Sequence, residues 1–107
     1  MIKNTKNKSK NLFNLNKKII IITGALGLLG KKHVEVVAEN GGVPIIIDIK
    51  NKEVQLFAKK IQQKYKVQAM GIDVDITDEK KIVKSCQKIL KKYKRIDGLV
   101  NNAANNP

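Results

Sequence analysis

The sequence predicts an α/β fold in which a doubly wound parallel sheet of four strands, in the order 3-2-1-4, is covered by three helices. Two observations lead to this prediction. Short, continuous apolar runs alternate along the chain with longer segments of helical periodicity. The runs carry apolar residues at successive positions, as is typical of parallel strands covered on both faces. Right-handed crossovers between such strands place helices on both sides of the sheet.

The expected strands occupy residues 18–23, 43–48, 67–73 and 98–101, and the expected helices occupy residues 28–39, 52–65 and 77–93. The residues expected to face the sheet are Val34, Val37 and Ala38 in the first helix, Val54, Phe57, Ala58 and Ile61 in the second, and Ile82, Cys86, Ile89, Leu90 and Tyr93 in the third. Gly41 and Gly42 end the first helix. Thr77 or Asp78 is a suitable N-cap for the third.

Composition sets limits on organisation and location. The 107 residues suffice for one domain, and we expect a disordered Lys/Asn-rich tail at 1–11 before a folded domain at 12–107. No apolar run has the length of a membrane span, and Cys86 has no partner for an internal disulfide. The cytoplasm is therefore the expected compartment. Cys86 is expected on the apolar face of the third helix, and we therefore interpret it as a buried structural thiol.

The net charge of +13 raises the alternative of a basic nucleic-acid-binding or structural module on the same fold. Arg95 is the only arginine among the 22 basic residues, and only 4% of the residues are aromatic. Base recognition favours arginine, and base stacking requires aromatic side chains. Lys, Asn and Ile also share A/T-rich codons, which explains the composition without phosphate binding. A nucleic-acid partner is therefore not expected.

The segment from Thr23 to Gly30 joins the first strand to the first helix and contains three glycines at intervals of three. Gly24 permits the tight turn, Gly27 lets a diphosphate approach the backbone, and Gly30 lets the helix pack closely. The N–H groups at the start of the helix then bind the anion. A glycine turn without a ligand is the alternative, but the strand–turn–helix context favours a dinucleotide site.

Asp48 ends the second strand, 24 positions after Gly24. A carboxylate at this position accepts hydrogen bonds from the adenosine ribose and repels a 2′-phosphate, so NAD is the expected cofactor and NADP is less favoured. Lys50 could soften that preference, and a solvated strand-end acid is the alternative role. Asp73 and Asp75 are too few ligands for a metal ion, so no metal site is expected.

These features resemble the short-chain dehydrogenase/reductase family, whose cofactor-binding half has the Rossmann fold. The resemblance covers residues 12–107 and rests on the Thr23–Gly30 turn, the stretch Asp75-Ile76-Thr77-Asp78 and the stretch Asn101-Asn102-Ala103-Ala104. It implies an oxidoreductase with a small-molecule substrate in a complete homologue. It also implies that Asp75 meets the adenine amino group and that Ile76 lines the adenine pocket. The cofactor-binding residues expected from the motifs and the resemblance together are Thr23, Gly24, Leu26, Gly27, Leu28, Leu29, Gly30, Asp48, Asp75, Ile76, Asn101, Asn102, Ala103 and Ala104.

The family's catalytic Tyr-x-x-x-Lys pair has no counterpart among these 107 residues. Tyr65 is followed four positions later by Ala69, and Tyr93 by Asp97. No catalytic residue is therefore assigned, and the chain alone is expected to bind the adenosine diphosphate half of NAD without turnover.

Overall fold

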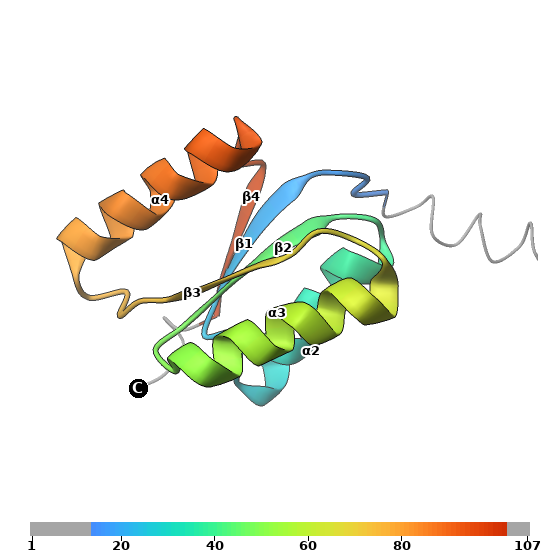
Figure 1. Cartoon of the computed structure of the whole chain (residues 1–107), viewed down its shortest axis with the longest axis horizontal. Coiled ribbons are helices and arrows are strands. Elements are labelled where there is room, and N and C mark those ends of the chain that lie inside the picture. Colours follow the sequence, from blue (N-terminus) through green and yellow to red (C-terminus); the bar gives the residue numbers. More distant parts are fainter. Residues whose placement is uncertain (1–13, 103–107) are drawn as a thin grey trace, which may run out of the picture.

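The computed structural model describes residues 14–102 and contains one parallel sheet in the order β3-β2-β1-β4. Its strands are β1 (Ile19–Thr23), β2 (Val43–Asp48), β3 (Met70–Asp73) and β4 (Gly98–Asn101), and its helices are α2 (Leu28–Glu39), α3 (Asn51–Tyr65) and α4 (Glu79–Tyr93). Figure 1 shows α2 and α3 together on one face of the sheet and α4 on the other. The predicted fold class, strand order and number of helices are confirmed within this part of the chain. The expected tail, together with Leu12, Phe13, Ala103 and Ala104, lies outside the described residues.

Most predicted boundaries agree with the structure to within one residue, but β3 begins at Met70 instead of residue 67. The preceding segment leaves α3 through Lys66, which adopts a left-handed conformation with φ of 58°. The Gln62 side chain donates a hydrogen bond of 2.8 Å to the Ala69 carbonyl. Because that side chain fixes the approach to β3, the segment from Val67 to Ala69 runs beside α3 before it joins the ladder.

The core has two layers, one on each face of the sheet. Ile22 and Ile46 face α2 and α3, whereas Ile21 and Ile45 face α4. The four side chains are all buried, as expected from the central position of β1 and β2. This alternation of side chains between the two faces explains why the runs are apolar at successive positions.

Two apolar side chains, Leu90 and Leu99, are exposed, and one of them was expected to be buried. Leu90 was expected to face the sheet but is 45% exposed, so that prediction is wrong. Ile89 is fully buried and occupies the centre of the helix–sheet contact, which turns Leu90 toward the flank of α4. Leu99 in the edge strand β4 is 62% exposed, although it pairs in register with the buried Ile21. No helix in the described part of the chain covers Leu99.

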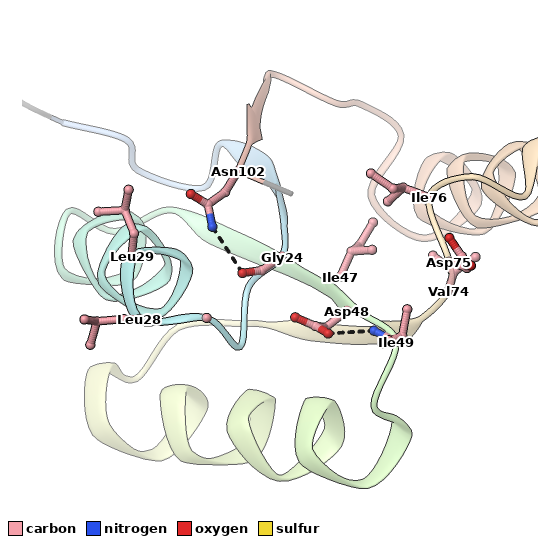
Figure 2. Close-up of a pocket in the computed structure, with 11 residues that line it drawn as sticks. Gly24, Leu28, Leu29, Ile47, Asp48, Ile49, Val74, Asp75, Ile76 and Asn102 are labelled. Carbon is pink, nitrogen blue, oxygen red and sulfur yellow. Dashed lines mark hydrogen bonds between the residues drawn. The ribbon is translucent and has the colours of Figure 1, made fainter. Parts of the chain in front are cut away.

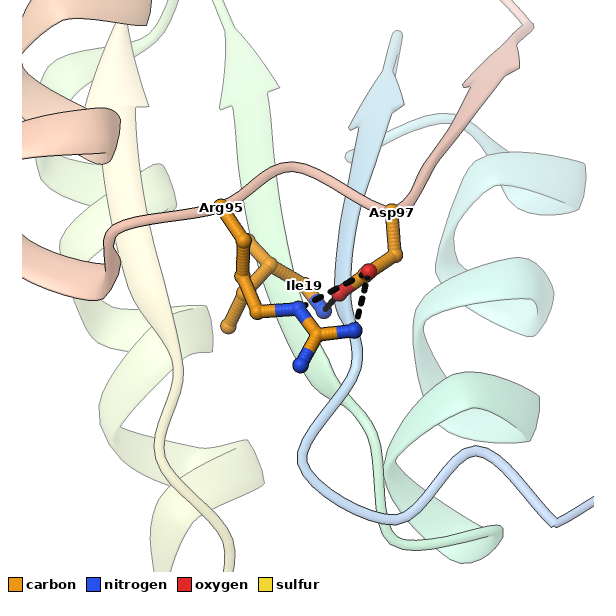
Figure 3. Close-up of polar contacts among 3 residues, drawn as sticks. All are labelled: Ile19, Arg95 and Asp97. Atoms are coloured by element: carbon orange, nitrogen blue, oxygen red, sulfur yellow. Dashed lines mark hydrogen bonds and ion pairs between the residues drawn. The ribbon is translucent and has the colours of Figure 1, made fainter.

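A carboxylate joins the first and last strands at the end of the sheet opposite the glycine turn. Asp97 Oδ2 accepts a 2.7 Å hydrogen bond from the backbone N–H of Ile19, and Asp97 Oδ1 accepts bonds of 2.9 and 2.6 Å from Nε and Nη2 of Arg95 (Figure 3). These contacts lower the pKa of Asp97, with the Arg95 hydrogen bond as the largest cause. The sequence did not single out Asp97, which fixes the start of β4 beside β1.

Candidate functional site

A cleft of about 440 Å³ lies at the carboxyl ends of the strands, where the glycine turn and the loops after β2 and β3 meet (Figure 2). Parallel sheets bind ligands at this edge because the chain leaves each strand there in a loop. The residues that line the cleft are Gly24, Gly27, Leu28, Leu29, Ile47, Asp48, Ile49, Val74, Asp75, Ile76 and Asn102.

The three glycines of the turn have different structural roles. Gly24 has φ of 60°, a left-handed conformation that favours glycine and starts the turn. Gly27 lines the cleft, and a Cβ there would meet only the Gly24 carbonyl oxygen, at 3.4 Å. A Cβ at Gly30 would overlap that same oxygen and lie 2.8 Å from Cα of Ala25. Gly30 therefore permits close packing of α2 on the turn, whereas Gly27 keeps the backbone accessible from the cleft.

Helix α2 begins at the cleft with its N-terminus suited to an anion. Its N-cap, Gly27, supplies no side-chain hydrogen bond, and its first turn contains no acidic residue. The first N–H groups of a helix have no partner inside the helix, and the helix dipole favours negative charge there. This end of α2 therefore has the donors and the open approach that a diphosphate group requires.

Asp48 lies at the end of β2 and holds the turn through its own hydrogen bonds. Its Oδ2 accepts a 3.0 Å bond from the backbone N–H of Leu26, and its Oδ1 accepts a 2.7 Å bond from the N–H of Ile49 (Figure 2 shows the latter). A carboxylate has about four lone-pair sites, so each oxygen retains one acceptor site. Asp48 can therefore position the turn and also accept hydrogen bonds from two hydroxyl groups of a ligand in the cleft.

Asp75 and Ile76 line the opposite side of the cleft, after β3. Asp75 Oδ1 accepts bonds from the backbone N–H of Thr77, at 2.9 Å, and from the Thr77 hydroxyl, at 2.7 Å. The backbone bond, then the hydroxyl bond, lowers the pKa of the Asp75 carboxyl. Asp75 is therefore a carboxylate at neutral pH, able to accept a hydrogen bond from an amino group.

Two asparagines at the end of β4 contact the strand that leads into the turn. The Thr23 hydroxyl donates a 3.0 Å hydrogen bond to Oδ1 of Asn101, and Nδ2 of Asn102 donates a 3.3 Å bond to the Gly24 carbonyl (Figure 2 shows the latter). Asn102 thus enters the cleft, whereas Asn101 and Thr23 line a neighbouring cavity on the α4 face.

The structure brings eight of the expected cofactor residues into the cleft: Gly24, Gly27, Leu28, Leu29, Asp48, Asp75, Ile76 and Asn102. Thr23, Leu26, Gly30 and Asn101 do not line the cleft, and Ala103 and Ala104 lie outside the described residues. Sequence reasoning missed Ile47, Ile49 and Val74. Each directly neighbours Asp48 or Asp75, and that adjacency was the available signal.

Among residues 14–102, no group of three or more His, Cys, Asp and Glu side chains is arranged to hold a metal ion. None of the helices in the described part of the chain has the length and apolarity needed to cross a membrane. Tyr65 donates a 2.9 Å hydrogen bond to Glu35 between α2 and α3, away from the cleft. That contact lowers the pKa of Glu35.

Known proteins with a similar sequence or fold include dehydrogenases and reductases. The chain is 28% identical over 89 residues to the post-translational flagellin modification protein A of Campylobacter coli, covering 83% of this chain and 35% of that protein. It is 34% identical over 91 residues to an NAD-dependent glycerol dehydrogenase of Listeria innocua, covering 85% and 34%. Its fold matches L-sorbose reductase from Gluconobacter frateurii, solved with NADPH and L-sorbose, with a TM-score of 0.82 at 20% identity over 88% of this chain and 36% of that one.

The chain therefore spans about a third of the length of these proteins, and the matched third is their N-terminal part. The model of the short chain dehydrogenase family matches residues 18–107. That range contains the glycine turn and the cleft beside it. The chain belongs to the short-chain dehydrogenase family and corresponds to the cofactor-binding part of its NAD(P)-dependent oxidoreductases.

Proposed function

We propose that this chain binds the adenosine diphosphate half of NAD in the cleft between the glycine turn, Asp48 and Asp75. The observation that supports this most strongly is the position of Asp48, whose carboxylate lies beside the open N-terminus of α2 and keeps free acceptor sites on both oxygens. The diphosphate would bind at the N–H groups of α2, and the ribose hydroxyls would donate to Asp48.

The preference for NAD over NADP follows from charge and belongs to the same proposal. In NADP, a 2′-phosphate replaces the ribose hydroxyl that would donate a hydrogen bond to Asp48. The phosphate and the Asp48 carboxylate, both negative, would then lie side by side. The relatives include both an NAD-dependent enzyme and one solved with NADPH, so their names do not decide the cofactor. Lys50 is exposed beyond Ile49, and its charge is the feature that would reduce the preference.

The adenine would lie against Ile76 and Val74, with its amino group donating to the Asp75 carboxylate. Thr77 holds that carboxylate in place through two hydrogen bonds, which reduces the ordering that binding requires. When bound, NAD supplies hydride chemistry. The residues described here would position the cofactor and do not transfer a proton. We further propose a cytoplasmic location, which rests on the sequence alone.

The experiment is a calorimetric titration of the 107-residue chain with NAD, NADP, ADP and nicotinamide mononucleotide. NAD and ADP should bind with similar affinity, NADP more weakly, and nicotinamide mononucleotide not measurably. Asp48→Asn should weaken NAD binding about tenfold, because it removes a charge-assisted acceptor.

Asp73→Asn is the matched control. Asp73 pairs in register with Asp48 and is exposed, but it does not line the cleft. Equal losses of NAD affinity in the two variants, or no NAD binding by a folded wild-type chain at millimolar ligand, would contradict the proposal.

A further inference from the structure

A basic cavity lies at the amino ends of the strands, at the edge of the sheet opposite the cofactor cleft. It has a volume of about 500 Å³, and Ile19 and Val43, the first residues of β1 and β2, form part of its wall. Among the described residues, none lines both this cavity and the cleft. Because β1 has five residues, roughly 15 Å of strand separates the two sites.

Three cationic side chains and, among residues 14–102, no acidic side chain line this basic cavity. Lys17 comes from the turn before β1, Lys66 from the end of α3, and Arg95 from the loop between α4 and β4. Segments far apart in the sequence therefore bring positive charge to one place. Within the described part of the chain, neither Lys17 nor Lys66 forms an ion pair.

Arg95 is held in place by a carboxylate that does not line the cavity. Asp97 accepts hydrogen bonds from Nε and Nη2 of Arg95 (Figure 3). Of the five N–H groups of the guanidinium, two are used in these bonds and three remain for a ligand. Because Asp97 offsets the charge of Arg95, Lys17 and Lys66 give the cavity a net charge of about +2 at neutral pH.

Tyr93 supplies a hydroxyl group that lacks a partner. Its side chain lines the cavity, and its hydroxyl oxygen is buried without a hydrogen-bond partner among residues 14–102. A buried hydroxyl without a partner costs free energy, so binding of a ligand oxygen that reaches it is favoured. Burial raises the pKa of Tyr93, so the hydroxyl stays protonated at neutral pH and can donate.

These groups match the chemistry of a phosphate monoester. Such a group carries a charge of about −1.5 to −2 at pH 7 and has three strong acceptor oxygens, whereas a carboxylate would leave one lysine without a counter-ion. The amide side chains of Asn16 and Gln68 also line the cavity and can bond hydroxyl groups. The volume lies within the range of small-molecule pockets, about 300–1,000 Å³. The first 13 residues of the chain contain no Asp or Glu, so they supply no side-chain carboxylate for the cavity.

We propose that the basic cavity at the amino ends of the strands binds a small organic phosphate monoester. The three cations and Tyr93 would contact the phosphate oxygens, and Asn16 and Gln68 would contact hydroxyl groups on the rest of the ligand. The cavity shares no residue with the cofactor cleft, so the proposal stands independently of cofactor binding.

The test is an NMR titration of the isotope-labelled 107-residue chain with glycerol phosphate. The amide signals of Lys17, Lys66 and Arg95 should shift together and saturate at millimolar ligand, and those of Gly24 and Gly27 in the cleft should not follow the same curve. Glycerol at the same concentration should cause no saturable shift. Inorganic phosphate should bind about threefold more weakly than glycerol phosphate, because it lacks the hydroxyl groups.

Lys66→Gly and Lys94→Gly form a matched pair of variants. Both lysines have a left-handed backbone, with φ of 58° and 69°, so glycine suits either position and neither variant should lose stability. Only Lys66 of the two lines the cavity. Lys66→Gly should therefore weaken glycerol phosphate binding about fivefold, and Lys94→Gly should not.

Tyr93→Phe removes the hydroxyl that has no partner, so it should not lower Tm, yet it should weaken glycerol phosphate binding about threefold. Thermal unfolding followed by circular dichroism checks the stability of every variant.

Three outcomes would overturn the proposal. The first is an equal effect of Lys66→Gly and Lys94→Gly, which would leave only the general attraction of a basic chain for anions. The second is a set of shifts confined to the cleft, which would place the phosphate at the N-terminus of α2. The third is a short single-stranded DNA that shifts the same amide signals and binds about tenfold more tightly than glycerol phosphate, which would make a nucleic acid the ligand.

Discussion

Gly30 and Gly27 lie three residues apart in one turn, yet replacing each by alanine should have a different consequence. Gly30→Ala should lower stability, and Gly27→Ala should weaken NAD binding. At Gly30 a Cβ would overlap the Gly24 carbonyl oxygen and lie 2.8 Å from Cα of Ala25 and 2.9 Å from the carbonyl carbon of Gly24. All three atoms belong to the backbone, so no side-chain rotation relieves the overlap. Alanine gains about 1 kcal/mol of helix propensity over glycine, and overpacking of this kind costs about 3 kcal/mol.

The net result for Gly30→Ala is a loss of about 2 kcal/mol in the free energy of unfolding, which corresponds to a fall of about 10 °C in Tm for a domain of this size. Gly27→Ala meets only one atom, at 3.4 Å, an ordinary contact distance. It should therefore leave stability within about 0.5 kcal/mol of wild type while weakening NAD binding. Urea denaturation followed by circular dichroism measures the first effect, and calorimetry measures the second. If Gly30→Ala unfolds at the same urea concentration as wild type, the packing argument is wrong.

Three further predictions test the core, the pH dependence and the chemistry. Ile21→Ala should destabilise the chain by about 3 kcal/mol and Leu99→Ala by less than about 1 kcal/mol, because these register partners are 7% and 62% exposed. Equal urea midpoints for the two variants would contradict the packing of α4 on Ile21. Asp97→Asn should lower stability most at pH 7, and the difference from wild type should shrink as pH falls below about 4, because a carboxyl with a lowered folded pKa stabilises the fold fully above its unfolded pKa and loses that effect as pH falls through its folded pKa. A constant difference across the acid range would exclude the Arg95 and Ile19 contacts as its source. The 107-residue chain should show no NADH formation with alcohol substrates, since neither tyrosine has a lysine four positions later. If the chain does turn over, and a substitution within residues 1–107 abolishes that turnover, the substituted residue is a catalytic group that this reasoning overlooked.

The sequence predicted the fold correctly where its apolar pattern allowed one interpretation. The continuous isoleucine runs could only be buried strands, and the three helical periods between them required crossovers, so order and handedness followed from general rules. The same logic was insufficient for Leu90. Its position in the helical period suits burial, but burial depends on whether another element lies above it, and periodicity contains no information about that.

The candidate site shows a similar division. The glycine spacing and Asp48 were recognisable, because a tight turn and a strand-end carboxylate each need one residue type at one position. The hydrogen bond from the N–H of Leu26 to Asp48 was not predictable, since it joins the turn to the neighbouring strand in space. Ile49 was missed although it directly follows Asp48 in the sequence.

The sequence by itself determined the order of elements, the parallel sheet and the residue types at the glycine turn, because local spacing and continuous burial restrict those features directly. The tertiary structure decided which side chains meet across strands. It joined Asp97 to Ile19, and Thr23 to Asn101, over separations of 78 residues. It also left Leu99 of the edge strand β4 exposed. These outcomes depend on the distances between elements distant in the chain, which no local pattern of residues specifies.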